Sequence, residues 1–483
     1  MPLQPLLPAA AVAANFIELK PPLRPQEAKV EAARCLYCFD APCITACPTG
    51  IDIPAFIKKI AFGNPAGAAK TILTANILGA SCARVCPTSV LCEGACVLDD
   101  RDEQPIQIGR LQRYATDFVE QNHISVLAKS TKSTGKKIAV IGAGPAGLGC
   151  AAELAQLGHR VTIFEKQLQP GGLNTYGIAY YKMKPEVSLA EVALVKSLGV
   201  ELRCGVNVGT DVTVTQLEQD YDAVFVGVGL GVAARLRIPG EDLPEVVDAL
   251  DFIAQIHTHP LEKIPVGRRV AVLGCGNTAI DAVTQSKRLG AERAFIVYRR
   301  GEADMSAYDF EYEHAKHDGT EFIFHAAAVE VLETGGHVSG LRLVRTLVVN
   351  GRAEVIPGSE WIESCDLVLK AVGQEKQVAL LRNLFPTLHV DSRGVIAHDK
   401  LTGQTNVPHI FVGGDCGNGG REVVNAVGEG KKAAHGIHRF LTSETVALPV
   451  QPSRLGAKQG SSGSGLLHPI RAHELEAALA RKS

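Results

Sequence analysis

The sequence predicts an α/β protein in which two domains built on parallel sheets follow a small α-helical domain. Residues 136–158 and 268–300 each contain a short apolar strand, a glycine turn and a helix, in the order typical of dinucleotide-binding folds. Eight of the 13 cysteines fall between residues 35 and 96. The chain has 48 glycines but only 5% aromatic residues, a balance that favours tight strand-to-helix turns. We therefore expect two Rossmann-like nucleotide-binding domains behind a cysteine-rich helical domain, and 483 residues suffice for about three domains.

Charge and hydropathy exclude several classes of protein. Lys plus Arg total 49 against 51 for Asp plus Glu, so no basic surplus is available for nucleic acid. No run approaches the roughly 20 apolar residues that span a bilayer. Residues 1–16 are apolar, but they contain three prolines and lack the basic residues with which a secretory signal begins. We expect a cytoplasmic protein, and in that compartment crowded thiols favour metal binding over disulfides.

The crowded cysteines indicate iron–sulfur clusters. They form two groups, Cys35, Cys38, Cys43 and Cys47, then Cys82, Cys86, Cys92 and Cys96. Pro48 ends the first group, and Cys-Pro after a tight run of four cysteines is typical of ferredoxin-like sites. A structural zinc site usually adds histidine or pairs of C-x-x-C, and no histidine lies between the groups. Eight thiols suffice for two [4Fe-4S] clusters, with structural zinc as the alternative. The apolar spacing between the groups is helical, so residues 1–134 should form an α-helical iron–sulfur domain.

The first glycine turn is expected to bind FAD, in a domain of residues 135–248 plus 366–445. In its G-x-G-x-x-G pattern, the first glycine allows the turn, the second admits a pyrophosphate and the third lets helix and strand pack. Glu165 ends the next strand, where an acid can bind ribose hydroxyls. A late strand that ends in Gly414-Asp415 suits the flavin's pyrophosphate and ribityl chain. The candidate residues are Gly142, Gly144, Pro145, Ala146, Gly147, Glu165, Lys166, Gly172, Leu173, Gly414 and Asp415.

The second glycine turn is expected to bind NAD(P)H, in a domain inserted at residues 249–365. Its candidate residues are Gly274, Gly276, Asn277, Thr278, Ala279, Arg299 and Arg300. No acid follows the second strand of this domain, and Arg299 and Arg300 stand there instead. Guanidinium groups suit a 2′-phosphate, so this pair favours NADPH, unless it is simply a solvated pair at a strand end.

The whole arrangement is similar to the small subunit of glutamate synthase, and it resembles still more closely the matching part of dihydropyrimidine dehydrogenase. The closer resemblance is carried by CxxCxDAPCxxxCPT at 35–49, VCPTSxLCxGxC at 85–96 and IGRLQR at 108–113. It spans about residues 30–440. The chain lacks the later FMN barrel of the animal enzyme, so it looks like the bacterial, PreT-type subunit that works with a separate catalytic subunit.

The resemblance implies a ligand set for each cluster. One cluster would take Cys35, Cys38, Cys43 and Cys96, and the other Cys47, Cys86, Cys92 and Gln112. Counting thiols alone selects Cys82 instead of Gln112, whereas the residue-by-residue match favours Gln112. A neutral amide in place of a thiolate makes a cluster less negative and should raise its potential, as histidine ligation does in Rieske centres.

The resemblance also implies an electron relay. A hydride from a nicotinamide nucleotide would reduce FAD, and the clusters would carry single electrons to an FMN-containing, PreA-type partner that reduces uracil or thymine to the 5,6-dihydro base. The bacterial relatives are typically NADH-linked and Ser306 replaces a basic residue, so we expect NADH, with NADPH as the alternative. The general acid should lie on the partner, and no catalytic residue is assigned here. The alternatives are a glutamate synthase small subunit, a free-standing NAD(P)H:acceptor or ferredoxin oxidoreductase, and a zinc-binding scaffold. Residues 446–483 are expected to be a flexible tail.

Overall fold

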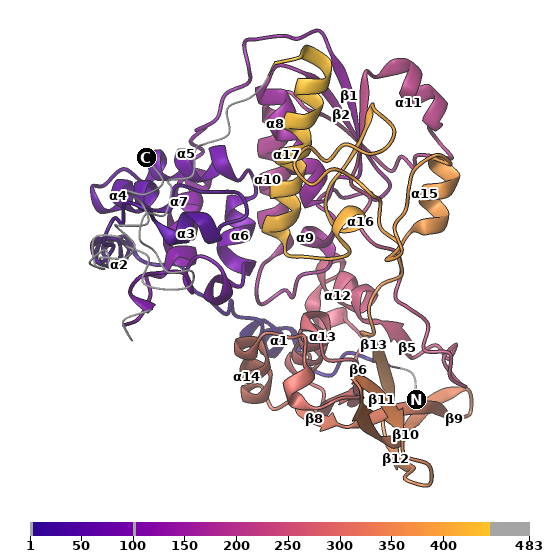
Figure 1. The fold of residues 1–483 in the computed structure, drawn as a ribbon. Coiled ribbons are helices and arrows are strands. Elements are labelled where there is room, and N and C mark those ends of the chain that lie inside the picture. Colours follow the sequence, from indigo (N-terminus) through magenta and orange to yellow (C-terminus); the bar gives the residue numbers. More distant parts are fainter. Residues whose placement is uncertain (1–2, 100–102, 445–483) are drawn as a thin grey trace, which may run out of the picture. The chain divides into compact units, whose positions relative to one another are not determined.

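The computed structural model describes residues 3–99 and 103–444, and Figure 1 labels its elements. The chain divides into two compact units, each assembled from several stretches of sequence. Unit 1 comprises Met1–Leu19, Gly172–Glu186 and Leu230–Gln377, and unit 2 comprises Lys20–Gly171, Val187–Gly229 and Val378–Ser483. The expected tail, 446–483, lies outside the described residues. Within the described ranges, no helix is both long and apolar enough to cross a membrane.

The cysteine-rich part of unit 2 is α-helical, as its spacing predicts. Its helices are α2 (Pro25–Ala33), α3 (Pro42–Ala46), α4 (Ile53–Ala61), α5 (Pro65–Ala75), α6 (Gly79–Val85) and α7 (Ile108–Gln121), with a 3-10 turn η1 (Thr88–Val90). Side-chain caps fix two of the starts, because the Asp52 carboxylate accepts from Ala55 N at 3.1 Å and the Asn64 side chain accepts from Gly67 N at 2.8 Å. Phe56 and Ile72 on α4 and α5 are fully buried between the helices.

The first sheet of unit 2 is parallel, in the order β14-β4-β1-β2-β3. Its strands are β1 (Lys137–Ile141), β2 (Arg160–Glu165), β3 (Glu201–Cys204), β4 (Ala223–Val226) and β14 (Ile410–Val412). The accompanying helices are α8 (Pro145–Gln156), α10 (Pro185–Ser197), α11 (Val214–Asp220), α15 (Val378–Leu384), α16 (Asp415–Asn418) and α17 (Val423–Thr442), while the short helix α9 (Leu173–Tyr176) belongs to unit 1. Because β14 pairs with β4, a late segment of the chain completes the sheet that β1 begins.

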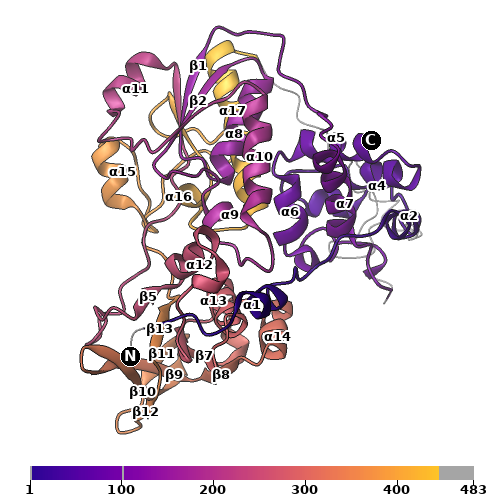
Figure 2. The same cartoon turned by 180° about the vertical axis from the view of Figure 1, so that it is seen from behind.

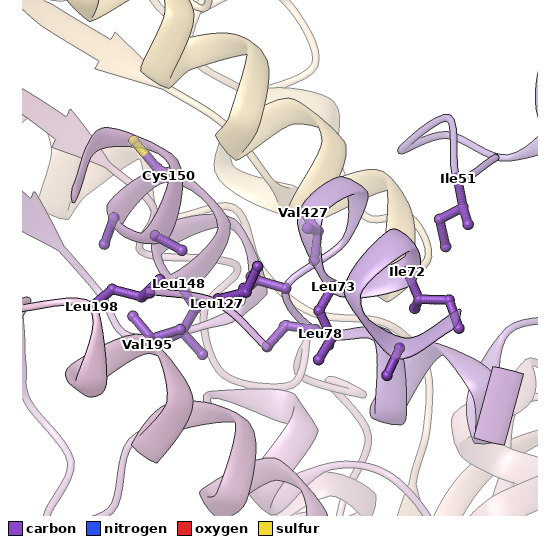
Figure 3. Packing of buried hydrophobic residues seen from close by; sticks show 14 of the residues in the cluster. Ile51, Ile72, Leu73, Leu78, Leu127, Leu148, Cys150, Val195, Leu198 and Val427 are labelled. Atoms are coloured by element: carbon purple, nitrogen blue, oxygen red, sulfur yellow. The ribbon is translucent and has the colours of Figure 1, made fainter. Parts of the chain in front are cut away.

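The helical region and the first sheet share one hydrophobic core. Figure 3 shows Leu73 and Leu78 from the helical region in the same cluster as Leu148 of α8 and Val427 of α17. Helices α8 and α17 lie side by side in Figures 1 and 2, and small residues allow this approach. A Cβ at Gly149 would lie 2.9 Å from the carbonyl oxygen of Val427. The cysteine-rich helices are therefore built onto the first nucleotide-binding fold.

Unit 1 contains a second parallel sheet in the order β5-β13-β6-β7-β8. Its strands are β5 (Val246–Asp248), β6 (Arg269–Leu273), β7 (Arg293–Tyr298), β8 (Glu321–Phe324) and β13 (Leu367–Lys370). Its helices are α12 (Ala249–Thr258), α13 (Asn277–Arg288) and α14 (Asp309–His317), with short 3-10 turns η3 (Leu261–Lys263) and η4 (Glu302–Asp304). An antiparallel sheet of β9 (Ala326–Thr334), β10 (His337–Val349), β11 (Arg352–Val355) and β12 (Trp361–Glu363) is inserted before β13. The predicted fold class, two Rossmann-like domains after a helical domain, is confirmed.

The N-terminal segment belongs to unit 1 although the helical region follows it directly in sequence. Helix α1 (Ala9–Asn15) buries Val12, and the following Phe16 is also buried, in the core that contains Ile256 and Leu289. The Asn15 amide donates to Arg288 O at 2.9 Å. These contacts and the pairing of β5 and β13 lead us to propose that the inserted domain covers 230–377, wider than the 249–365 expected from sequence, and that the helical domain begins near residue 20.

Candidate functional site

Four thiols from both sequence groups line one hollow in the helical region. The hollow has a volume of about 390 Å³, and Cys35, Cys38, Cys43 and Cys96 are among its lining residues. The rest of the lining is apolar: Leu36, Pro42, Ile53, Pro54, Ile57, Ala95, Val97, Leu98, Ile106 and Ile108. Cys96 therefore lies with the first three cysteines of the chain, and not with the other three cysteines of its own sequence group.

Burial makes these thiols poor acids in the absence of a cation. Burial, with smaller contributions from the neighbouring Cys38 and Cys96 thiols, raises the pKa of Cys35 to about 11. Burial also raises the pKa of Cys43, with Cys35, Cys96 and Cys38 as its charged neighbours. Four thiolates in an apolar hollow need a cationic centre that binds sulfur, because burying unpaired charges is costly. The donor set and its surroundings thus fit a soft metal centre.

The other four cysteines form a second thiol group, made of Cys47, Cys82, Cys86 and Cys92. A hydrogen bond with Cys82 and burial raise the pKa of Cys86, and the Cys92 and Cys47 thiols add to the effect. Burial likewise raises the pKa of Cys92, and the nearby Glu93 and Cys47 side chains raise it to a smaller extent. In the described part of the chain, no three Cys, His, Asp or Glu side chains are arranged as the ligands of a single metal ion.

Both candidates for the eighth ligand are tied to helix α6. Cys82 lies within this helix, is buried and pairs with Cys86, the residue that ends the helix. Gln112, on α7, is also buried, and its Nε2 donates to the carbonyl oxygen of Gly79 at 2.7 Å. This bond uses the amide nitrogen of Gln112 and leaves the carbonyl oxygen Oε1, the atom that could ligate iron.

The first glycine turn, between β1 and α8, has the shape of a phosphate cradle. Gly142 has φ +100°, and a Cβ there would lie 2.5 Å from the carbonyl oxygen of Gly227 on the adjacent strand end. A Cβ at Gly147 would overlap the carbonyl oxygen of Gly142, so helix and strand pack backbone to backbone. A Cβ at Gly144 would meet nothing within 4 Å. Pro145 and Ala146 open α8 behind this space, so the helix N-terminus can offer backbone N–H groups to a pyrophosphate.

The structure brings Glu165 and Gly414 to this turn. The buried Glu165 carboxylate accepts from Ala143 N at 2.7 Å and from Gln167 N at 2.8 Å. A Cβ at Gly414 would lie 2.9 Å from the Cβ of Ala146, and Asp415 begins α16 directly after it. The late segment therefore reaches the start of α8.

The remaining first-turn candidates follow Glu165 in sequence, and Gly171, which precedes two of them, donates its N–H to Ala143 O of the turn at 2.9 Å. Lys166 is exposed next to Glu165. Gly172 and Leu173 are grouped with unit 1, where Gly172 has φ +57° and precedes α9.

Sequence reasoning missed Glu429, which holds the turn that carries Gly414. The Oε2 of Glu429 accepts from Gly414 N at 2.9 Å and from Asn418 Nδ2 at 2.9 Å. Glu429 lies on α17, and neither its spacing nor its neighbours in the sequence mark it as part of a nucleotide site. Only the packing of α17 beside α8 reveals the contact.

The second glycine turn, in unit 1, repeats the geometry of the first. Gly274 has φ +119° and lies against the backbone of Ala371 at the end of β13. At Gly276, a Cβ would meet only the Ser306 hydroxyl, at 3.1 Å. The Asn277 side chain accepts from Tyr308 N at 3.1 Å, which ties the segment containing Ser306 to the turn. Thr278 and the buried Ala279 continue the first turn of α13.

Arg299 and Arg300 directly follow β7, whose Val297 carbonyl accepts from Gly274 N at 3.1 Å. Arg299 is exposed, and its carbonyl oxygen accepts from Thr346 Oγ1 at 2.8 Å. Arg300 is half-buried, and its Nε has no hydrogen-bond partner among the described residues. Both backbones are thus fixed near the second turn, with guanidinium groups available to an anion.

Comparison with known families agrees with this layout. Residues 12–124 match dihydropyrimidine dehydrogenase domain II, 4Fe-4S cluster. Residues 136–430, well over half of the chain, match pyridine nucleotide-disulphide oxidoreductase. The chain belongs to the pyridine nucleotide-disulphide oxidoreductase family. As a member with an added 4Fe-4S domain, it is an oxidoreductase that combines iron–sulfur and flavin nucleotide chemistry.

Individual relatives place this family member near two kinds of subunit. The chain is 36% identical over 430 residues to the NAD-dependent dihydropyrimidine dehydrogenase subunit PreT of Escherichia coli K12, covering 88% of this chain and 98% of that protein. It is also 36% identical over 449 residues to the glutamate synthase [NADPH] small chain of the same strain, covering 88% and 94%. Identity alone therefore does not separate the two branches. Among solved structures, Mycobacterium tuberculosis FprA in complex with NADPH shares the fold, with TM-score 0.53 and 22% identity over 65% of this chain and 88% of FprA.

Proposed function

We propose that this chain is the electron-transfer subunit of a dihydropyrimidine dehydrogenase. It would take electrons from NADH and deliver them to a partner subunit that contains FMN and reduces uracil or thymine. The observation that carries the proposal is the regrouping of the eight thiols. Cys96 joins the first three cysteines and Cys47 joins the second group, which is the division implied by the resemblance to that enzyme.

In this proposal the first turn of unit 2 holds FAD. Gly144 leaves room for the pyrophosphate, the start of α8 donates backbone N–H groups to it, and Glu165 accepts from a ribose hydroxyl. Gly414, held by Glu429, and the following Asp415 would close the site from the late segment. A bound flavin supplies the conversion between hydride transfer, two electrons at once, and the single-electron transfers of iron–sulfur clusters.

The two thiol groups would each hold a [4Fe-4S] cluster. Cys35, Cys38, Cys43 and Cys96 would ligate the first cluster, and Cys47, Cys86, Cys92 and Gln112 the second. The bond to Gly79 uses the amide nitrogen of Gln112 and not its carbonyl oxygen, which supports a role as ligand, and Cys82 would then remain a thiol beside Cys86. A Gln112→Cys variant should lower the potential of one cluster, because a thiolate adds negative charge, and unchanged potentials would count against this ligand.

The second turn, in unit 1, would bind the nicotinamide nucleotide, with NADH preferred. Arg299 and Arg300 offer positive charge to a 2′-phosphate. Ser306, which lies beside Gly276 of the second turn, offers only a hydroxyl. Comparing kcat/KM for NADH and NADPH tests the preference, and a strong preference for NADPH would contradict it.

A second candidate is the small subunit of a glutamate synthase, because that relative is as similar in sequence as PreT. The two candidates differ in the partner. A dihydropyrimidine dehydrogenase partner needs electrons for a pyrimidine, whereas a glutamate synthase partner hydrolyses glutamine. The chain would work in the cytoplasm in either case, because crowded thiols in that compartment favour metal binding over disulfides.

The deciding experiment is anaerobic co-purification with the FMN subunit, followed by measurement of NADH-dependent loss of uracil. We expect about eight irons per FAD, from two four-iron clusters, and uracil loss only when both subunits are present. Glutamine-dependent formation of glutamate with a large partner would favour the second candidate. Dye reduction by NADH without stable capture of any partner would favour a free-standing oxidoreductase. Zinc without labile sulfide would favour a scaffold.

A further inference from the structure

Helix α6 is held by a carboxylate from a distant part of unit 2. We propose that this carboxylate, Glu191 on α10, is a positioning residue for the cluster of the second thiol group. This inference rests on the proposed function, because it concerns a cluster that the function requires. It adds a residue that lies outside the cysteine motifs and outside both glycine turns.

Glu191 acts as the N-terminal cap of α6. The carboxylate is 4% exposed, and its Oε1 accepts from Ala80 N at 2.7 Å and from Ser81 N at 3.0 Å. The Ser81 hydroxyl donates to the other oxygen, Oε2. The residue before the helix, Leu78, provides no side-chain cap of its own. A carboxylate at this position pairs two otherwise orphaned N–H groups and meets the positive end of the helix dipole.

The position of α6 determines the position of three candidate ligands. Cys82 lies on α6 and Cys86 ends it, while Gln112 donates to the carbonyl oxygen of Gly79, the first residue of the helix. A displacement of α6 would therefore move two thiols and turn the Gln112 amide. Whichever of Cys82 and Gln112 is the eighth ligand, its placement depends on the same helix.

A buried ion pair joins α6 to α7. Arg84 of α6 contacts Asp117 Oδ1 at 2.7 Å, and Asp117 Oδ2 accepts from Arg113 Nε at 3.1 Å. Arg84 also donates to Ala80 O at 3.0 Å, next to the peptide that Glu191 caps. A change at Glu191 would consequently reach α7, which carries Gln112.

A second contact from the first nucleotide-binding fold supports the remaining ligand segment. A Cβ at Gly428 of α17 would lie 2.8 Å from the carbonyl oxygen of Pro48, the residue after Cys47. Helix α10 therefore positions the α6 side of the second thiol group, and α17 positions its Cys47 side. Figures 1 and 2 show α6 beside α10 in both views. The part of the chain proposed to hold FAD thus fixes the thiols proposed to receive its electrons.

The test uses the full chain and its cluster spectra. In Glu191→Ala, two N–H groups and a hydroxyl lose their buried partner, so α6 must shift or admit water. We expect one of the two cluster signals in the electron paramagnetic resonance spectrum of the reduced protein to shift or disappear. The rate of cluster reduction after NADH addition should fall by about tenfold or more, because small displacements of electron-transfer partners are costly. Flavin content and NADH–ferricyanide activity should stay unchanged.

Three further variants separate positioning from general destabilisation. Glu191→Gln keeps one carbonyl acceptor for the two N–H groups and should restore most of the lost signal. Ser81→Ala removes the hydroxyl that donates to Oε2, leaves the two backbone N–H bonds to Oε1 in place, and should give a smaller change in the same signal. Glu186→Gln makes the same substitution at an exposed position on the same helix and should change nothing.

Unchanged signals and reduction rates in both Glu191→Ala and Ser81→Ala would overturn the role of Glu191. If Glu191→Ala fails to fold, the other two variants decide. A shifted signal in Ser81→Ala together with an unchanged signal in Glu191→Gln supports the role of Glu191, and unaltered spectra in both variants overturn it. Iron and sulfide in the unmodified protein are measured first. Their absence would overturn the proposed function, whereas normal clusters that do not respond to Glu191 would overturn this inference alone.

Discussion

Two glycines of the first turn, two residues apart, are glycines for different reasons. Gly142 has a positive φ and lies against the carbonyl oxygen of Gly227, so its missing side chain serves the fold. Gly144 has φ −74°, an ordinary value, and a Cβ there would enter empty space. Its missing side chain serves only an incoming ligand. The same sequence motif therefore contains one structural and one ligand-dependent position.

Alanine at each position should separate these effects. Gly142→Ala should destabilise the fold by about 1–3 kcal/mol through strain and the close approach to Gly227 O, and should also lower flavin content. Gly144→Ala should leave the thermal unfolding midpoint of the flavin-free protein unchanged while flavin content falls. The measurements are calorimetry of the flavin-free protein and flavin per chain as purified. Gly135→Ala, at φ +74° with nothing within 4 Å, is the control for strain alone and should keep its flavin.

Ser306 gives a second test at the scale of one residue. A guanidinium at this position, beside Gly276, would add a charged donor for a 2′-phosphate. Ser306→Arg should therefore raise the ratio of kcat/KM for NADPH to that for NADH by about tenfold, the equivalent of one charged hydrogen bond. Ser339→Arg, at an exposed position on β10, should leave the ratio unchanged. An equal ratio in both variants would mean that Ser306 does not face the 2′-position.

Helix α17 shows how one element can join several functions. It pairs with α8, holds Gly414 through Glu429 and contacts Pro48 through Gly428. Its His438 also bonds His159 at the start of β2, with 2.8 Å between Nδ1 and Nε2. Both rings are buried. A hydrogen bond between two ring nitrogens needs one donor and one acceptor, so at least one of the two rings has to be neutral.

The histidine pair predicts a loss of stability in mild acid. Burial, followed by the neighbouring His438, lowers the pKa of His159 to about 4 from an ordinary value of 6.5. The unfolded chain therefore binds this proton more readily, so the stabilisation is complete above pH 6.5 and is lost as the pH falls through 4. The unfolding midpoint of His159→Gln should fall less steeply between pH 6.5 and 4 than that of the unmodified protein, corresponding to about 1–3 kcal/mol. His317→Gln, at an exposed position, should keep the original slope.

At the scale of elements, features formed by adjacent residues could be predicted from the sequence more fully than contacts between residues far apart in the chain. Strand, glycine turn and helix are adjacent in sequence, so both nucleotide-binding folds could be predicted, as could the helical character of residues 53–77, between the cysteine groups. The thiol groups could not be predicted from spacing, because Cys96 and Cys47 each join partners from the other sequence group, and only the resemblance implied that exchange. Glu191 and Glu429 had no sequence signal at all, since each acts on backbone N–H groups over 100 or 15 residues away.

The complete molecule combines two nucleotide-binding folds with an attached pair of thiol sites. The first fold and the thiol sites share a core, so they should unfold together, whereas the second fold has its own core. Chain order could not predict this division. Residues 3–19 precede the helical domain but pack in unit 1, where Val12 and Phe16 fill its core.

The proposed relay predicts that NADH oxidation at the nucleotide sites can be separated from electron delivery through the thiol sites. Removing iron with an oxidant and a chelator should abolish electron delivery to the FMN partner, because the thiol sites then carry no redox centre. NADH–ferricyanide activity should remain, because it needs only the two nucleotide sites. Parallel assays before and after reconstitution with iron and sulfide provide the check. Loss of both activities together would show that the first fold depends on the clusters for its stability, as their common core permits.

The placement of α1 has a practical consequence for dissecting the chain. A fragment that begins at residue 230 would carry the second sheet without Val12 and Phe16, and would expose the apolar core residues that these side chains cover. Such a fragment would be expected to aggregate on expression. Supplying residues 1–19 together with 172–186, the other segments of unit 1, should restore solubility, so the boundaries of an expressed fragment have to follow the packing of this domain and not the order of the chain.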